Sequence, residues 1–415
     1  MATALDPCAK PLEQQRKAYS QQSSTSETCT DENADLLARL SQCLEDDDEP
    51  NPPRGPTLTP IAPVHSRPLP VPVEVASASL IFASLPVIPQ LAAFKPKTSL
   101  WSLRNPGNLC FLNSLLQNLA RLAPLMILLE APQDGSRPAA EGTPLSSTFN
   151  HFCSKVNSEG TKCMQATKTT DAFHRVLPDL ISPFSSGLQR QQDAHEVLLR
   201  LIEKLDLEGS SAGHRYLNPF AHGRRQHFGH PLPAVCSGLI KQEMTCTRCT
   251  LKSERKESFL CLSIPIPLQP EVSVDSMMAA YFSGNEVQYR CSTCGSNAAL
   301  VQQSVEMWPT VLIVHFLRWR GASKISTIIK IPPVWSLLAD SACPKYKLNG
   351  YILHHGQRAN VGHYTAVVRM SVNGTDQYHK ISDDMIDAVP VERSLYSRDG
   401  FPSTTCYLAF YVLDK

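Results

Sequence analysis

The 415-residue sequence predicts an α+β fold in which a mainly helical part precedes a mainly antiparallel β-sheet. Before Cys236 the apolar residues recur at helical spacing, most clearly over 110–122 and 194–205. After Cys236, short runs of β-branched and aromatic residues end in turn residues, which is the pattern of strands. We expect a cleft where the helical part and the sheet meet.

Composition and charge narrow the classes of function. Apolar residues make up 42% of the chain, which is enough for a sizeable core. The 39 basic and 38 acidic residues give a net charge of +1, so no overall field attracts nucleic acid or an anionic membrane. The chain opens Met-Ala-Thr-Ala-Leu-Asp-Pro, which does not have the pattern of a secretory leader. We therefore expect an intracellular protein, cytoplasmic and/or nuclear, that binds neither nucleic acid nor membrane.

Residues 1–98 differ in composition from the rest of the chain. They contain Ser, Thr and Gln runs, an acidic cluster over Glu45–Glu49 and many prolines over Pro50–Pro89. This composition predicts a disordered Ser/Pro-rich N-terminal tail, whose partners the sequence does not identify. The prolines leave only Val75–Leu85 as an uninterrupted apolar run, which is too short to span a bilayer. A globular domain is expected over 99–415.

One cysteine lies where a turn is expected to become a helix. Pro106 and Gly107 break any preceding regular structure, and an apolar stripe then begins at Cys110 and continues until Pro124 stops the helix. In the first turn the unpaired N–H groups and the helix dipole favour an anion, so the pKa of the Cys110 thiol should fall. A buried structural cysteine is the alternative interpretation, because cysteine is among the most buried residue types.

A second, stronger helix is expected to begin within Gln191–Glu196, which reads Gln-Gln-Asp-Ala-His-Glu. The acidic residues of this run suit the positive end of the helix dipole. An ordinary charged helix start is the alternative to a functional site here. Shorter helices are expected over Leu145–Phe152 and Asp171–Leu177.

Strands are expected throughout the second half of the chain. Each predicted strand is short, rich in β-branched or aromatic residues, and followed by turn residues. The predicted strands are Ser258–Pro265, Val287–Cys291, Val311–Trp319, Tyr346–His354, Tyr364–Met370, Tyr378–Ile381 and Tyr407–Leu413.

Two Cys-x-x-Cys pairs predict a metal site. Cys246 and Cys249 form the first pair, Cys291 and Cys294 form the second, and 41 residues lie between the pairs. Each pair has the spacing at which a tight turn directs two thiolates at one Zn²⁺, and a site made of four thiolates is structural. We expect one structural zinc ion and no catalytic cofactor. The alternatives are a redox dithiol, vestigial cysteines and a nucleic-acid-binding zinc ribbon, whose spacer is usually shorter.

A histidine and a carboxylate near the C-terminus are candidates for one shared site. Gly362 precedes His363, and a Gly-His step at the start of a strand can direct an imidazole into a cleft without crowding. The predicted strand Tyr378–Ile381 is soon followed by Asp383. If the two strands are neighbours, the carboxylate can fix the tautomer of the imidazole and stabilise an imidazolium paired with a thiolate. Taken alone, each of these residues would be interpreted as an ordinary surface residue.

Together these segments resemble the ubiquitin-specific protease family of cysteine deubiquitinases over roughly Trp101–Leu413. The motifs that carry the resemblance are the Cys box Gly107–Ser114, the helix start Gln191–Glu196, the paired Cys-x-x-Cys motifs, the strand end Leu317–Trp319 and the His box Gly362–Tyr364. The resemblance implies a papain-like hand fold. Its parts would be a helical thumb over about 101–235, zinc-bearing β fingers over about 236–310 and a β-sheet palm over about 311–415.

The resemblance also implies a function. The chain would be a thiol-dependent hydrolase that cleaves the isopeptide or peptide bond after the C-terminal glycine of ubiquitin, with ubiquitin and ubiquitinated proteins as partners. By the matching motifs, Cys110 is the nucleophile, His363 is the base and then the acid, and Asp383 orients His363, with Asp384 as its substitute. Asn105, five residues before Cys110, matches the side chain that donates to the oxyanion.

The same resemblance implies where the substrate binds. Asp193, Gln192 and Tyr364 are expected to contact the C-terminal tail of ubiquitin. The two arginines of that tail suit a carboxylate partner such as Asp193.

The chain departs from the family pattern at several positions. Leu109 replaces the usual Thr before the cysteine, Leu317 replaces a Lys and Trp319 replaces a Phe. Ser382 replaces a Phe before Asp383, which should loosen the orienting carboxylate. None of these changes removes a group that catalysis needs, so we expect an active enzyme. A catalytically weak ubiquitin-binding module and a protease for another ubiquitin-like modifier are the alternatives.

Overall fold

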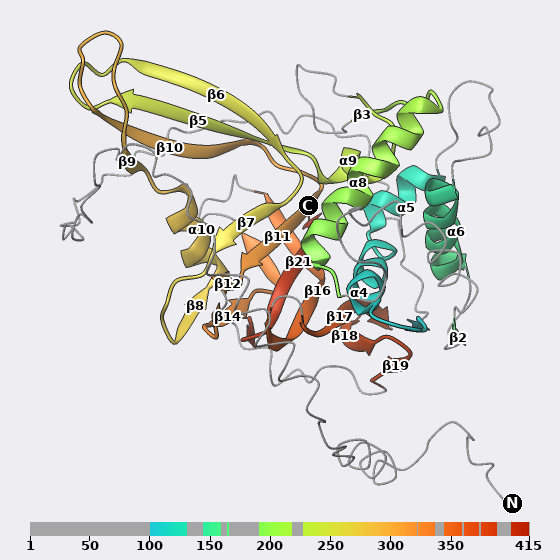
Figure 1. Cartoon of the computed structure of the whole chain (residues 1–415). Helices are drawn as coiled ribbons and strands as arrows, with labels where there is room; N and C mark the ends of the chain where they lie inside the picture. The colour runs from blue at the N-terminus through green and yellow to red at the C-terminus, as the bar shows by residue number, and fades with distance from the viewer. Residues whose placement is uncertain are drawn as a thin grey trace, which may run out of the picture. The chain divides into compact units, whose positions relative to one another are not determined.

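The computed structural model describes residues 100–130, 144–158, 164–165, 191–217, 227–321, 323–336, 344–358, 361–372, 375–387 and 400–414. The predicted tail over 1–98 and the predicted helix Asp171–Leu177 lie outside these residues. Within them, helices dominate the first part and strands the second (Figure 1), so the predicted α+β class is confirmed.

The helices of the described residues gather mostly in the first part of the chain. They are α4 (Cys110–Leu119), α5 (Ala123–Glu130), α6 (Pro144–Ser158), α8 (Ala194–Ser211), α9 (Pro231–Cys236) and α10 (Val274–Phe282). The prediction that Pro124 stops a helix is wrong in detail, because α4 already ends at Leu119 and Pro124 lies in the first turn of α5. Proline is tolerated there because an N–H in the first turn has no partner within the helix.

Helix α4 is buried along its whole length. It packs against α8 on one side and against the sheet strands β16 (Lys345–Arg358) and β17 (Val361–Val372) on the other (Figure 1). Among the helices of the described ranges, none is by itself long and apolar enough to cross a membrane, whereas the bent pair α4 and α5 passes that test on length and composition together.

The largest sheet has the order β19-β18-β17-β16-β21-β11-β7, with β15 paired to β16. Its remaining strands are β7 (Leu262–Pro265), β11 (Val311–Leu317), β15 (Val334–Ser336), β18 (Thr375–Ser382), β19 (Met385–Ile386) and β21 (Cys406–Asp414). Neighbouring strands are antiparallel except β11 and β7, so the predicted mainly antiparallel sheet is confirmed.

Both faces of this sheet are covered, which the alternation of side chains along β11 makes clear. Val311 and Ile313 belong to the core that the sheet shares with α4 and α8. Leu312 and Val314 belong to the core on the opposite face, which α10 covers. Because successive side chains of a strand point to opposite faces, the uninterrupted apolar run Val311–Val314 fits a strand that is covered on both faces.

The contact between α4 and the sheet is close enough to require a glycine. A Cβ atom at Gly350 of β16 would lie 2.2 Å from Oδ1 of Asn118 and 2.4 Å from the carbonyl oxygen of Val367. Any side chain at this position would therefore push the helix away from β16 and β17. The absence of a side chain lets the N-terminal end of α4, with Cys110, lie against the start of β17.

A second sheet has the order β6-β5-β10-β9 and forms the long ribbon at the upper left of Figure 1. Its strands are β5 (Gly238–Cys246), β6 (Lys252–Phe259), β9 (Asn285–Gln288) and β10 (Ala298–Met307). The predicted single strand Ser258–Pro265 is wrong, because it is interrupted between Phe259, where β6 ends, and Leu262, where β7 begins. The two strands belong to different sheets. The predicted strand Val287–Cys291 is also misplaced, since β9 ends before the turn that carries Cys291.

Three pairs of short strands and one small three-stranded sheet complete the described part of the fold. They are β1 (Trp101–Ser102) with β2 (Met164–Gln165), β3 (Tyr216–Leu217) with β4 (His227–Phe228), β12 (Trp319–Arg320) with β13 (Ser323–Lys324), and β14 (Ile328–Ile331) between β8 (Glu271–Ser273) and β20 (Phe401–Ser403). The predicted strand Val311–Trp319 thus comprises β11 and the first residue of β12. The interruption between them is Arg318.

Arg318 is a buried cation that ties these short strands together. Its guanidinium donates to the carbonyl oxygens of Cys406 at 2.8 Å, Thr327 at 2.8 Å, Ser403 at 3.0 Å and Ile325 at 3.2 Å. Burial lowers its pKa to about 10, so it stays protonated at neutral pH. The planar fork of donors holds the β12–β13 hairpin against the segment that leads into β21.

Replacing Arg318 with Lys should lower the free energy of unfolding by about 2–5 kcal/mol, because one ammonium cannot serve carbonyl groups that surround a guanidinium on several sides. Urea denaturation followed by circular dichroism measures the change. Arg320→Lys is the matched control, since Arg320 is exposed only two residues away and its substitution should change stability by less than about 0.5 kcal/mol. Equal effects of the two substitutions would contradict the anchoring role of Arg318.

Candidate functional site

Cys110 is the first residue of α4 and lies beneath the surface, with 4% of its area exposed. Its sulfur accepts a hydrogen bond from Nε2 of Gln191 at 3.3 Å and another from the backbone N–H of Tyr364. The first donor precedes α8 and the second belongs to β17. The sulfur therefore lies where the helical part and the sheet meet, and the cleft expected at this junction stays a prediction.

The predicted lowering of the Cys110 pKa is wrong. Burial is the largest influence and raises the pKa above its ordinary value. The N–H of Tyr364 and the amide of Gln191 act in the opposite direction, the carboxylate of Asp383 raises the pKa further, and the N–H of Phe111 in the helix start lowers it least. The sequence located the N-terminus of the helix correctly. The loss of solvent around the sulfur raises the pKa by more than the N–H groups of the helix start lower it. In this arrangement the thiol form predominates at neutral pH.

Gln191 joins the sulfur to the segment that carries the candidate histidine. Its Nε2 donates to the carbonyl oxygen of Gly362 at 2.9 Å as well as to the sulfur of Cys110. Gly362 directly precedes His363, so the bridge fixes the two chain segments next to each other. Gln191 was not among the predicted site residues, although it opens the Gln-Gln-Asp run from which Gln192 and Asp193 were chosen.

His363 lies near the start of β17, opposite His355 of β16. A Cβ atom at Gly362 would lie 2.2 Å from the carbonyl oxygen of His355 and 2.5 Å from Nε2 of His354. This close approach is the physical reason for a glycine before the histidine. The side chain of His363 is 40% exposed, so a substrate can reach it.

Asp383 lies close to His363 but outside hydrogen-bond distance. The strands β17 and β18 pair directly, as predicted, and Oδ2 of Asp383 lies 4.0 Å from Nε2 of His363. The carboxylate instead accepts hydrogen bonds from Nδ2 of Asn105 at 2.9 Å and Nδ2 of Asn113 at 2.8 Å. Its backbone adopts φ +52°, a left-handed conformation that Asp tolerates. The helical part of the chain thus holds this carboxylate in place.

Ser382 makes the direct contact to the imidazole. Its Oγ lies 2.8 Å from Nε2 of His363. A hydrogen bond from Nε2–H to this oxygen leaves Nδ1 as the basic nitrogen of the ring. The expected loosening at this position is therefore offset by a hydroxyl contact that a phenylalanine could not provide.

Asn105 connects the loop before α4 with Asp383. Its Oδ1 accepts from the backbone N–H groups of Gly107 at 3.2 Å and Leu109 at 3.0 Å, which fixes the turn in front of Cys110. Its Nδ2 faces Asp383, and one of the two N–H bonds on that nitrogen suffices for this contact. Donation to an oxyanion stays a prediction. Asp384 is exposed beside this site, and its role as a substitute for Asp383 also stays a prediction.

The predicted substrate contacts surround the start of α8. Asp193 caps this helix, because its Oδ1 accepts from the N–H groups of His195 at 2.8 Å and Glu196 at 3.0 Å. Its Oδ2 accepts a short hydrogen bond from the hydroxyl of Tyr407. Both carboxylate oxygens therefore have partners within the chain, and binding of an arginine by Asp193 stays a prediction.

The other two predicted substrate contacts differ in exposure. Tyr364 is buried, with 1% of its area exposed, and burial followed by the charge of Asp193 raises the pKa of its hydroxyl. Gln192 is half-buried immediately before Asp193. Their contacts to a substrate remain predictions.

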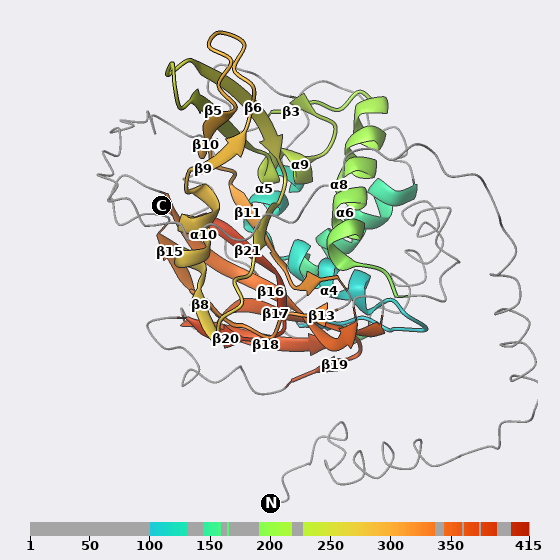
Figure 2. The same cartoon turned by 60° about the vertical axis from the view of Figure 1, so that its left-hand side comes forward.

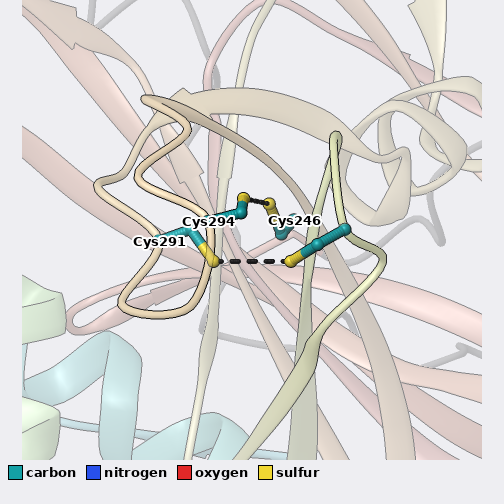
Figure 3. Close-up of side chains that lie close together, drawn as sticks. Cys246, Cys291 and Cys294 are labelled. Atoms are coloured by element: carbon teal, nitrogen blue, oxygen red, sulfur yellow. Dashed lines mark hydrogen bonds between the residues drawn. The ribbon is translucent and has the colours of Figure 1, made fainter.

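The four cysteines of the two Cys-x-x-Cys pairs come together at the end of the four-stranded sheet. Cys246 ends β5 and Cys249 follows it in the turn to β6, whereas Cys291 and Cys294 lie between β9 and β10. Figure 3 shows the side chains of Cys246, Cys291 and Cys294 gathered together. Their sulfur atoms all lie within 4.8 Å of one another, with 3.6 Å between Cys246 and Cys294 and between Cys249 and Cys291.

The two cysteine turns have the same backbone geometry. Thr250 and Gly295, which follow the two pairs, adopt φ +58° and +67°, and each donates its N–H to the carbonyl oxygen of Cys246 or Cys291 at 3.0 Å. Backbone N–H groups of the two turns are the main cause that lowers the pKa of Cys246 and of Cys291, whereas the pKa of Cys249 is raised. Four sulfurs bound tetrahedrally at about 2.3 Å from one ion lie about 3.8 Å apart. The cluster therefore fits a single tetrahedral metal ion.

Several curated relatives are similar to this chain over 70–75% of its length. The sequence is 26% identical over 303 residues to a probable ubiquitin carboxyl-terminal hydrolase 16 of Schizosaccharomyces pombe, covering 70% of this chain and 63% of the relative. It is 26% identical over 330 residues to ubiquitin carboxyl-terminal hydrolase 23 of Arabidopsis thaliana, covering 75% of this chain and 35% of the relative. It is 25% identical over 363 residues to ubiquitin carboxyl-terminal hydrolase 21 of Rattus norvegicus, covering 75% and 61%. The chain thus spans less than two thirds of each of these relatives.

Solved structures share the fold. One is a SAGA DUB module of Ubp8, Sgf11, Sus1 and Sgf73 bound to ubiquitin aldehyde, with a TM-score of 0.61, 19% identity and coverage of 78% of this chain and 71% of that one. Another is the same kind of module bound to monoubiquitin, with a TM-score of 0.60, 18% identity and coverage of 78% and 71%. The predicted papain-like hand, with a helical thumb, a β-sheet palm and β fingers that carry the cysteine cluster, is confirmed.

The family model described as ubiquitin carboxyl-terminal hydrolase matches residues 102–411, which include the whole site around Cys110 and His363 as well as the four cysteines. This match covers well over half of the chain, and it agrees with the relatives and with the fold. The chain belongs to the ubiquitin carboxyl-terminal hydrolase family.

Proposed function

We propose that the chain is a thiol-dependent deubiquitinase that hydrolyses the isopeptide or peptide bond after the C-terminal glycine of ubiquitin. The observation that carries the proposal is the position of the Cys110 sulfur, which is hydrogen-bonded to the N–H of Tyr364 directly beside His363. The names of the relatives and the ubiquitin bound in the similar structures support ubiquitin as the substrate. Ubiquitin and ubiquitinated proteins are the proposed partners.

The roles of the residues follow from their chemistry. His363 takes the proton of Cys110 as the sulfur attacks the carbonyl carbon of the terminal glycine. The resulting oxyanion accepts a hydrogen bond from Asn105, a type of contact worth about 3 kcal/mol. His363 then gives its proton to the departing amine, which leaves a thioester on the sulfur. A water molecule deprotonated by His363 hydrolyses the thioester and restores the thiol.

The environment of the imidazole supports this sequence of proton transfers. Ser382 and, at longer range, Asp383 lie on the Nε2 side of His363. Hydrogen bonding there keeps Nδ1 available for the thiol proton, and the nearby carboxylate stabilises the imidazolium that forms. Because burial raises the pKa of Cys110, proton transfer to His363 accompanies the attack instead of preceding it in the free enzyme.

We propose that the four cysteines bind one structural zinc ion. Four thiolates leave no open coordination position for a substrate, so the ion would join the β5–β6 and β9–β10 turns and supply folding free energy only. Thiolate ligands suit Zn²⁺ better than Mg²⁺ or Ca²⁺. The catalytic steps above use only side chains of this chain and water.

The domain organisation and location are part of the same proposal. Residues 1–98 form the N-terminal tail and 99–415 the catalytic domain, with thumb, fingers and palm over about 101–235, 236–310 and 311–415. The proposed location is intracellular, cytoplasmic and/or nuclear, because conjugated ubiquitin is the substrate.

Replacing Cys110 with Ala should abolish hydrolysis of a ubiquitin–amide reporter, since no other group on this path supplies a nucleophile. Release of the reporter fluorophore measures hydrolysis, and binding of ubiquitin should persist.

Cys153→Ala is the control, because Cys153 is buried in α6. Its substitution should leave turnover within about twofold after correction for folded protein. Undiminished hydrolysis by the Cys110 variant would refute this nucleophile. Turnover of another ubiquitin-like modifier alone would refute the substrate.

Replacing Ser382 with Ala should lower kcat about 10-fold or more, because Nε2 of His363 loses its direct partner and Asp383 lies too far away to replace it. Asp383→Asn should lower kcat as well, because a neutral amide does not stabilise the imidazolium. Steady-state kinetics with the reporter separates kcat from KM. If Ser382→Ala keeps full kcat and Asp383→Asn does not, the carboxylate alone orients the ring and the role of Ser382 is wrong.

Cys291→Ser should remove the bound metal and lower the melting temperature by several degrees, because one of four thiolate ligands is lost. Elemental analysis of the purified chain should find about one zinc per wild-type molecule. Ser292→Ala in the same turn is the control and should retain the metal. A wild-type chain that is folded and free of zinc would contradict the metal site.

A further inference from the structure

We propose that Lys324 is a positioning residue for His363, acting through His354 and Gly362. It belongs to the β12–β13 hairpin, and β13 lies against the end of β16 (Figure 2). The role in turnover rests on the proposed function, whereas the contacts that carry it do not depend on that function.

The ammonium of Lys324 binds the end of β16 through three acceptors. Its Nζ donates to the carbonyl oxygen of His354 at 2.6 Å and to that of Gly356 at 2.9 Å, and it lies 3.2 Å from Nδ1 of His354. An ammonium has three hydrogens, so these contacts use all of them. Burial and the nearby guanidinium of Arg318 lower its pKa to about 8, which leaves it mainly protonated at neutral pH.

These contacts determine the state of the His354 ring. An ammonium can only donate, so Nδ1 of His354 accepts and the hydrogen of the neutral ring lies on Nε2. Burial, followed by the charge of Lys324, lowers the pKa of His354 to about 4, which agrees with a neutral ring. The ring is completely buried. Lys324 therefore holds the position of His354 and favours the tautomer with the hydrogen on Nε2, a buried atom that has no hydrogen-bond partner among the described residues.

The fixed ring supports the residue before the catalytic histidine. A Cβ atom at Gly362 would lie 2.5 Å from Nε2 and 2.7 Å from Cε1 of His354, so the backbone of Gly362 rests directly on the imidazole. From another direction, Nε2 of Gln191 binds the carbonyl oxygen of Gly362 and the sulfur of Cys110. Gly362 is thus held between a group fixed by Lys324 and a group that contacts the nucleophile.

The strand pairing is irregular at this segment. The ladder between β16 and β17 is regular as far as the pair His355 and His363, and its register then shifts before Arg358 pairs with Val361. Gly356 in the shifted part has φ +123°, and its carbonyl oxygen is one of the three acceptors of Lys324. Lys324 supplies a restraint at the point where the regular hydrogen bonds of the sheet end.

A positioning role differs in its kinetics from a substrate contact and from simple stabilisation. Loss of Lys324 lets Gly362 and His363 move relative to Cys110, which weakens proton transfer from the thiol. Misplacement of a catalytic group by about 1 Å lowers rates about 100-fold. A residue that only touches ubiquitin would change KM, and a residue that only stabilises the fold would change the melting temperature without changing turnover per folded molecule.

The test uses the full chain with Lys324→Met, Lys324→Gln and, as control, Lys345→Met, which removes an exposed lysine from the start of β16. We expect Lys324→Met to lower kcat on a ubiquitin–amide reporter by about 10- to 100-fold with KM within about twofold. Lys324→Gln should fall between this variant and the wild type, because its amide retains donors but is shorter and uncharged. It also allows the comparison if the Met variant does not fold. The control should match the wild type.

A second readout does not require ubiquitin. The rate of Cys110 alkylation by iodoacetamide is measured against pH for the wild type, for His363→Ala and for the Lys324 variants. We expect the profile of Lys324→Met to move toward that of His363→Ala. A rise in KM alone, or a loss of melting temperature with kcat and the alkylation profile unchanged, would overturn the proposal. If the wild type cleaves no ubiquitin reporter, the proposed function fails, and the alkylation profiles still decide whether Lys324 positions His363.

Discussion

The close packing of α4 on β16 and β17 is the constraint on which the site depends. Gly350 allows the helix to approach the sheet, since any side chain there would strike Asn118. The approach brings the first residue of α4 into hydrogen-bond contact with Gln191 and with the backbone of Tyr364. A nucleophile and a histidine that are far apart in the sequence become neighbours because a helix and a sheet share one buried core.

Hydrogen bonds from amide groups hold this arrangement without adding net charge. Gln191 links the sulfur to Gly362, while Asn105 and Asn113 hold the carboxylate of Asp383. In this arrangement the sulfur of Cys110 is buried, and its burial raises the pKa of the thiol. A raised pKa protects the thiol from adventitious chemistry and makes the correct placement of His363 essential, because the imidazole must remove the proton during the attack.

Short motifs allowed the family and the fold class to be predicted from the sequence, whereas the distances between the candidate site residues could not be predicted. The motifs around Cys110, His363 and the Cys-x-x-Cys pairs consist of residues close together in the sequence, so they can be recognised without a structure. The polar strands β5 and β10 were missed because only the two end residues of β5 and Ala299 of β10 are buried, so their apolar pattern is weak. The sign of the Cys110 pKa shift and the contact between Ser382 and His363 depend on burial and on distances across strands, which spacing does not determine.

The central claim is that Cys110, placed beside the Gly362–Tyr364 segment, attacks the C-terminus of ubiquitin. The most direct measurement is mass spectrometry of the intact chain, and then of its peptides, after incubation with ubiquitin that carries an electrophile in place of its terminal glycine. The account predicts a single covalent adduct that maps to Cys110 and that disappears in Cys110→Ala. An adduct on a different cysteine, or no adduct with the folded chain, would contradict it.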